Sequence, residues 1–301
     1  MGNDSEFVAV LQQLKSAHVL CLGDVLLEVC ADGSLLPAAA EGAPVLAVAQ
    51  EMRQVGGAGR VLRDLAALGA PTTFVSVVGN DDAGREIERL LAAEAGAEIH
   101  LLVQPDRTTA RRSRFAAAGS TLLRVDRESP MALGPYIRED LLRLARELVT
   151  THGAVVISDH GKGVVTEGVA LEVIRAARDA GARSIVDAQG GDPIRYRGAD
   201  LLTVTQSELA QATGMPVAEA AAIEAAAGAL IDRCGVGAVL VSLDGGGAMV
   251  VESGGGAHRE AIADDAGVAI IAAALGAGLP ARTALRLATA AGLIGGADVA
   301  G

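Results

Sequence analysis

Short aliphatic segments alternate with amphipathic segments along most of this chain. Residues 73–79, 154–158 and 239–243 consist mainly of Val, Ile and Leu, the composition of strands that are buried on both faces of a sheet. Between such segments, residues 60–69 and 166–180 repeat apolar positions every three or four residues, which is typical of helices packed on one face. This alternation of strand and helix predicts an α/β fold.

One part of the chain departs from this rhythm. Residues 44–48 follow a segment rich in Ala, Gly and Pro and read as an edge strand outside the main sheet. Residues 108–114 and 120–126 read as two strands that pair as a hairpin around Gly119. Together these strands would form a small sheet across the main one, and such a sheet suits a lid over a reaction that excludes water.

The composition narrows the classes of protein. Hydrophobic residues make up 50% of the 301 residues and aromatic residues only 2%, so the core must be aliphatic. A net charge of -12 argues against a nucleic-acid or anionic-membrane surface. The three cysteines form no C-x-x-C pair, and no basic leader or membrane-spanning apolar run is visible. We therefore expect a cytoplasmic protein without a membrane or nucleic-acid partner.

Candidate ligand-binding residues follow the predicted strands. Asp24 ends the first strand and Glu28 lies just beyond it, while Asp187 and Glu208 occupy similar places later in the chain. Ligands of open α/β sheets collect beyond the carboxyl ends of strands. The glycine-rich turn 54–59 enters a helix and would let a ligand approach backbone N–H groups. No G-x-G-x-x-G follows the first strand, which argues against a dinucleotide-binding oxidoreductase.

Two acids, Asp264 and Asp265, precede an apolar segment at 268–275 that predicts a buried helix. They are open to two interpretations. They can cap the helix and favour its first turn. Alternatively, the helix N-terminus can hold an anionic phosphate while a carboxylate beside it accepts a proton.

Five motifs follow one another along the chain: Gly23-Asp24-Val-Leu-Leu-Glu28, Gly56-Gly57-Ala58 with Leu65–Ala70, Leu122–Asp126, Ser158–Gly163 and Tyr196–Thr203. In these motifs and their order, the chain resembles the ribokinase-like (PfkB) carbohydrate kinases, and within them the heptose 7-phosphate kinase domain of the ADP-heptose pathway.

The resemblance implies one ribokinase-like domain over residues 1–301, a three-layer sandwich with a mainly parallel central sheet. The lid strands would lie within 26–50 and 108–126 and would serve as a homodimer interface. The implied reaction is phosphoryl transfer from Mg²⁺-bound ATP to a hydroxyl of a sugar or sugar phosphate.

The resemblance also assigns roles to individual residues. Asp265 would be the catalytic base that deprotonates the acceptor hydroxyl, and Glu208 would hold Mg²⁺ through water. The residues implied to contact the acceptor are Asp24, Glu28, Gly56, Gly57, Arg60 and Arg112. The residues implied to contact ATP are Thr205, Gln206, Ser207, Glu208, Ser242, Gly245 and Gly247.

The chain departs from the family pattern at several of these places. Glu28 replaces an Asp, Arg60 and Thr205 each replace an Asn, and Gln189 replaces a Lys. Ile262-Ala263-Asp264 stands where Gly-Ala-Gly is expected. Losing one preorganised donor of an anion hole costs about 10²- to 10³-fold in rate. The alternative to a kinase is therefore a catalytically impaired relative that binds nucleotide or sugar as a regulatory subunit.

Overall fold

The computed structural model describes residues 14–36, 42–94, 96–128, 130–244, 246–255, 257–260 and 267–295, with the side chains of 259, 260 and 289–295 left aside. Within these ranges no helix is long and apolar enough to cross a bilayer.

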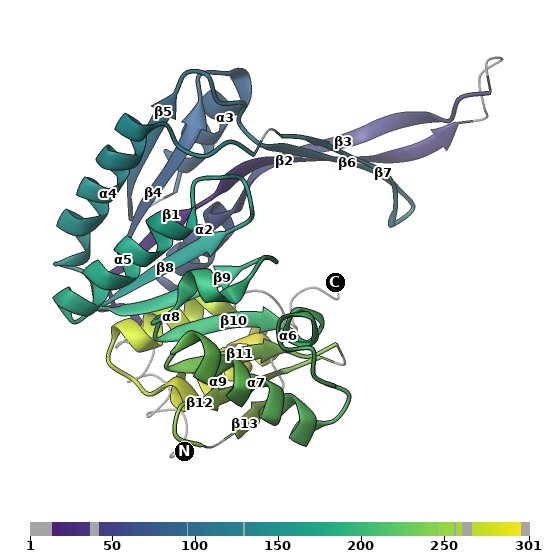
Figure 1. The fold of residues 1–301 in the computed structure, drawn as a ribbon. Coiled ribbons are helices and arrows are strands. Elements are labelled where there is room, and N and C mark those ends of the chain that lie inside the picture. Colours follow the sequence, from purple (N-terminus) through teal and green to yellow (C-terminus); the bar gives the residue numbers. More distant parts are fainter. Residues whose placement is uncertain are drawn as a thin grey trace.

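The body of the molecule is built on a nine-stranded sheet (Figure 1). Its order is β13-β12-β11-β10-β9-β8-β1-β4-β5, with parallel pairing from β11 to β5 and antiparallel pairing of β12 and β13. The strands are β1 (Val19–Gly23), β4 (Thr72–Gly79), β5 (Ala97–Gln104), β8 (Ala154–Asp159), β9 (Arg183–Ala188), β10 (Leu201–Thr205), β11 (Ala238–Ser242), β12 (Ala248–Glu252) and β13 (Ala257–Glu260).

Helices cover both faces of this sheet and enclose two separate apolar cores. Strand residues alternate between them, so Leu20 and Leu22 join one core while Val19 and Cys21 join the other. The first core is closed by α4 (Pro135–Val149), α5 (Glu167–Ala180), α6 (Gln206–Thr213) and α7 (Ala220–Cys234). The second is closed by α2 (Ala58–Leu68), α3 (Asp82–Leu91), α8 (Gly267–Gly276) and α9 (Ala281–Gly295).

A second sheet of four strands projects from the body as a long arm (Figure 1), and we call it the lid. Its order is β3-β2-β6-β7, and the hairpin of β6 and β7 turns through Ala118 and Gly119, both at positive φ. The strands are β2 (Val25–Leu36), β3 (Val45–Gly57), β6 (Arg111–Ala117) and β7 (Ser120–Arg127).

The predicted α/β fold with a mainly parallel sheet and a small β lid is confirmed. Two details differ from the sequence prediction. The lid strands are longer than expected, since β3 reaches Gly57 and joins α2 directly. The prediction also omitted β5, β13, α6 and α7.

Candidate active site

A cavity of about 640 Å³ lies at the carboxyl ends of the body strands, next to the base of the lid. Thr205 and Ser242, the last residues of β10 and β11, are paired neighbours in the sheet and both line it. Gly267 and Val268, at the start of α8, line it as well. Of the residues proposed from the sequence, the cavity is lined by Glu28, Gly57, Arg60, Arg112, Thr205, Glu208, Ser242 and Gly247. Residues nearly 220 positions apart in the chain therefore share one cavity.

The cavity has two chemically different halves. The half beside the lid combines Glu28 with Arg60 and Arg112, which brings an acceptor of hydrogen bonds close to two cationic side chains. The Arg112 guanidinium lies 3.9 Å from Glu28 Oε1 and also donates to Asp126 on β7. The half beside β10 and β11 is lined by polar side chains, by aliphatic ones such as Leu240 and Leu243, and by glycine backbone, including Gly246.

Asp24 does not line this cavity. Its side chain is completely buried, and its carboxylate accepts hydrogen bonds from the backbone N–H groups of His160, Lys162 and Val164, at 2.8 to 2.9 Å. Burial raises the pKa of this carboxyl, although the three hydrogen bonds act in the opposite direction. In this geometry Asp24 holds the loop 160–164, from which His160 lines the cavity, and its assignment as a sugar contact stays a prediction.

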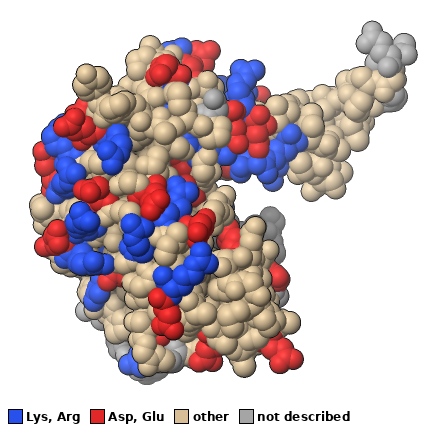
Figure 2. All heavy atoms as spheres, viewed as in Figure 1, with Lys and Arg blue, Asp and Glu red and all other residues tan. Residues whose placement is uncertain are grey.

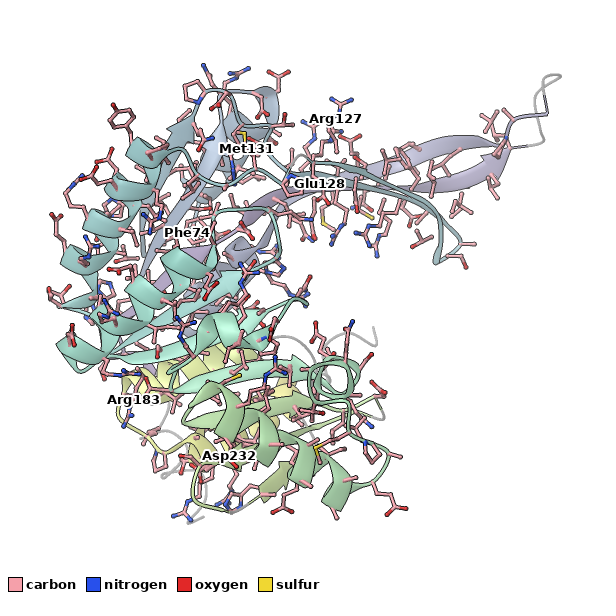
Figure 3. The ribbon with its side chains drawn as sticks, viewed as in Figure 1. Phe74, Arg127, Glu128, Met131, Arg183 and Asp232 are labelled. Carbon is pink, nitrogen blue, oxygen red and sulfur yellow. The ribbon has the colours of Figure 1, made fainter. Side chains whose placement is uncertain are left out.

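The same loop is joined to the base of the lid. The Arg107 guanidinium is almost fully buried and donates to the carbonyl oxygens of Met131 and Lys162, at 2.7 and 2.8 Å. The Lys162 ammonium forms an ion pair with Glu128, which follows β7. Glu128 lies where the lid joins the body, with Met131 nearby on the body side (Figure 3). The cavity wall and the root of the lid thus form one hydrogen-bonded unit.

Glycine occupies the last two positions of β3 for two different physical reasons. Gly57 has φ of 64°, and a Cβ there would lie 2.4 Å from the Asp24 carbonyl oxygen, so both conformation and space require glycine. Gly56 has no such conformation, but a Cβ there would lie 2.7 Å from Glu28 Cδ. Gly56 does not line the cavity itself; it leaves room for the Glu28 side chain that does.

Glu208 is held firmly at the start of α6. Its carboxylate accepts from the Thr205 N–H at 2.8 Å and from the Gly190 N–H at 2.8 Å, while the Thr205 hydroxyl caps the helix in return. Gln206 does not line the cavity, but its side chain accepts from the Asp244 N–H and braces the adjoining loop. Ser207 also lies outside the lining.

Two more residues line the site: Asp187, which the sequence marked at a strand end without a specific role, and His160, which it did not single out. Asp187, near the end of β9, lines the cavity and accepts a hydrogen bond from the Thr203 hydroxyl at 3.0 Å. His160 lines it from the loop that Asp24 holds, with its Nε2 3.0 Å from Ser158 Oγ. The position of Asp187 at a strand end marked it in the sequence, whereas His160 lies within the Ser158–Gly163 motif but was given no role.

Part of the predicted site lies outside the described residues. Gly245, Asp264 and Asp265 belong to segments whose placement is not described, as does Ile262. The assignment of Asp265 as the base therefore stays a prediction, although Gly267, two positions later, lines the cavity.

Comparison with known proteins agrees with the architecture. The model of the pfkB family of carbohydrate kinases matches residues 16–294. The chain is 40% identical over 97% of its length to a "Bifunctional protein HldE" of Paramagnetospirillum magneticum and 39% identical over 95% to that of Rhodospirillum rubrum. It covers 62% and 60% of those relatives, so it spans about three fifths of their length.

Solved structures show the same fold. Arabidopsis thaliana ribokinase complexed with ribose and ATP superposes with a TM-score of 0.72 at 21% identity, over 92% of this chain and 91% of that one. Escherichia coli phosphofructokinase-2 in complex with fructose-6-phosphate gives 0.71 at 21% identity, over 92% of both chains.

Proposed function

Because this chain belongs to the pfkB family of carbohydrate kinases, we propose that it transfers a phosphoryl group from Mg²⁺-bound ATP to a hydroxyl of a sugar phosphate of the heptose 7-phosphate class. The observation that carries the proposal is the single cavity that joins Glu28, Arg60 and Arg112 to Thr205, Glu208 and Ser242. With ATP in one half of the cavity and the sugar phosphate in the other, the phosphoryl donor and its acceptor lie together. Positioning of this kind accounts for much of the rate enhancement in phosphoryl transfer.

The half beside the lid suits a phosphorylated sugar. A carboxylate accepts hydrogen bonds from sugar hydroxyls, which is the role we assign to Glu28. Arginine matches the geometry of a phosphate with two parallel N–H donors, which suits Arg60 and Arg112 to the phosphate of the acceptor. A neutral sugar would offer neither guanidinium group a phosphate to bind.

The other half suits a nucleotide with its metal ion. Mg²⁺ keeps several waters and is usually held by one or two carboxylates together with substrate phosphates. Asp187 and Glu208, which line this half, fit such a donor set. Within the described ranges no cluster of three or more His, Cys, Asp or Glu side chains could hold a metal ion without such phosphates. When bound, Mg²⁺ neutralises charge on the β- and γ-phosphates.

The proton of the acceptor hydroxyl must leave as the new bond forms. We assign its removal to Asp265, as the family resemblance implies. What supports this assignment is that the start of α8, at Gly267 and Val268, lines the cavity.

We further propose that a second copy of the chain covers the lid. Most of the exposed large hydrophobic side chains among the described residues belong to it: Leu35, Leu36, Val48, Met52, Leu122, Leu123 and Val125, each 43% to 56% exposed. Figure 2 shows the outer part of the lid with few charged residues, while Lys, Arg, Asp and Glu gather at its base. Apolar surface of this extent on an isolated element is a typical interaction site.

The test is ADP formation by the purified protein with Mg²⁺-ATP and a panel of acceptors that includes heptose 7-phosphate, hexose 6-phosphates and the corresponding free sugars. We expect turnover with a sugar phosphate and at least 10-fold lower kcat/KM with its dephosphorylated form. Titration calorimetry with ATP and Mg²⁺ accompanies the assay. Nucleotide binding without turnover on any acceptor would contradict the kinase and favour a binding or regulatory protein.

A further inference from the structure

The Glu28 side chain is held by a chain of hydrogen bonds that begins outside the cavity. Glu28 on β2 and Gln54 on β3 are directly paired in the lid, so their side chains share one face of the sheet. Gln54 Nε2 donates to Glu28 Oε2 at 2.9 Å, and Arg63 Nη1 on α2 donates to Gln54 Oε1 at 3.0 Å. The cavity is lined by Glu28 but by neither Gln54 nor Arg63.

The chemistry of these three groups permits only one arrangement. A guanidinium can only donate hydrogen bonds, and an ionised carboxylate can only accept them. Gln54 must therefore turn its oxygen to Arg63 and its NH₂ group to Glu28. The fixed amide transmits the orientation set by Arg63 on the body helix to a carboxylate on the lid.

Two further contacts limit where the carboxylate can go. Oε1, the oxygen that Gln54 does not hold, lies 3.9 Å from the Arg112 guanidinium. The side chain crosses directly over Gly56, where any Cβ would come within 2.8 Å of its Cγ, Cδ and Oε1. Without Gln54, the attraction of Arg112 would act unopposed, and the carboxylate would turn toward β6.

We propose that Gln54 and Arg63 are positioning residues that fix the Glu28 carboxylate for the hydroxyl groups of the acceptor and so contribute to acceptor specificity. This rests on the proposed function, in which Glu28 contacts the acceptor sugar. Gln54 and Arg63 act only through Glu28, so the nucleotide half of the cavity, lined by Thr205 and Ser242, is independent of them.

The central variant is Gln54→Glu, which keeps the size of the side chain and its bond to Arg63 but removes the donor to Glu28. We expect the acceptor KM to rise roughly 10- to 100-fold, the range for losing a hydrogen bond to a charged group, with the KM for ATP unchanged. Lowering the pH should restore part of the affinity, because a proton shared by the two carboxylates recreates the donor. Gln54→Leu should show the same rise without the recovery at low pH.

Arg63→Leu tests the relay, by which we mean the chain of hydrogen bonds from Arg63 through Gln54 to Glu28. It should raise the acceptor KM several-fold in the wild-type background and have no further effect in Gln54→Leu, because both residues act on one path. Arg175→Leu on the exposed face of α5 is the matched control and should leave both KM values unchanged. The proposal would be overturned if both Gln54 variants kept the wild-type acceptor KM. It would also be overturned if the effects of the Arg63 and Gln54 substitutions were additive, or if the KM for ATP rose as much as the acceptor KM.

Calorimetric titration with the acceptor alone separates this proposal from the proposed function. If the wild-type protein binds a sugar phosphate but does not phosphorylate it, the kinase proposal fails and the relay is read from the change in Kd among the variants. If the wild-type protein neither binds nor phosphorylates any acceptor in the panel, both proposals fail.

Discussion

Every residue of β1, β4 and β8 in the body sheet is buried, whereas every residue of β7 in the lid is exposed. The body strands are covered by helices on both faces, and their side chains fill two apolar cores. Among the described residues, no helix lies over the outer part of the lid (Figure 1). The body is therefore stabilised by its own burial, while the lid depends on its strand ladder, on its junction with the body and on whatever covers it.

The largest difference in stability between the body and the lid should appear when a phenylalanine in each is replaced by alanine. Phe74 on β4 is completely buried, so Phe74→Ala should cost about 3–5 kcal/mol of unfolding free energy. Phe115 on β6 is only half-buried, so Phe115→Ala should cost less than about 2 kcal/mol. Urea unfolding followed by circular dichroism measures both. Equal losses would show that the lid carries as much of the stability as the body.

A substitution at the junction between the body and the lid should lower the unfolding free energy almost as much. Asp24→Asn keeps the shape of the side chain but turns an NH₂ group toward backbone N–H groups that need an acceptor. We expect a loss of about 3 kcal/mol, since buried donors without partners cost about 1–3 kcal/mol each. The control is Asp140→Asn on the exposed face of α4, which should change stability by less than about 0.5 kcal/mol. An unchanged urea midpoint in Asp24→Asn would contradict the structural role of Asp24.

A charge on the lid should affect association more than the fold of the single chain. Leu123 is 56% exposed on β7, so Leu123→Glu should convert a dimer to monomer in sedimentation velocity. At a concentration where the wild-type protein is itself monomeric, the unfolding midpoints of the two proteins should agree within about 2 °C. Tyr136→Glu, on a body side chain that is 84% exposed, is the matched control and should remain dimeric. A wild-type protein that is monomeric at all concentrations would contradict the proposed lid interface.

The smallest effect concerns the pH dependence of stability, which we assign to a histidine at the end of the body sheet opposite the cavity. His152 Nε2 lies 2.9 Å from the Thr73 hydroxyl and Nδ1 faces the Leu148 carbonyl oxygen, and burial lowers the pKa of His152 below its usual value. The unfolded chain therefore binds the proton more tightly, so stability present above about pH 6.5 is lost as the pH falls toward the folded pKa. The urea midpoint should drop between pH 7.5 and 5.5, and His152→Gln should reduce that drop. An identical drop in the variant would exclude His152 as its source.

Motif order in the sequence was enough to identify eight of the 23 residues that line the cavity. Glu28, Gly57, Arg60, Arg112, Thr205, Glu208, Ser242 and Gly247 were all proposed from the sequence, and the structure brings them together. The strand-end residues Thr205 and Ser242 share the cavity because parallel strands deliver their carboxyl ends to one edge of the sheet whatever the rest of the chain does. The elements that were missed, β5, β13, α6 and α7, lack that support. β5 carries polar residues on an edge, and α7 is so rich in alanine that its apolar stripe has little contrast.

The sequence by itself determined the α/β alternation, the separate lid and the strand ends at which ligands gather, since these follow from local periodicity and turn chemistry. Only the tertiary structure decided which way each strand-end side chain points. Asp24 and Glu28 are four residues apart with similar chemistry, yet Asp24 turns inward to N–H groups some 140 positions away and Glu28 faces the cavity. The relay from Arg63 through Gln54 is likewise a contact among three elements that no local pattern encodes.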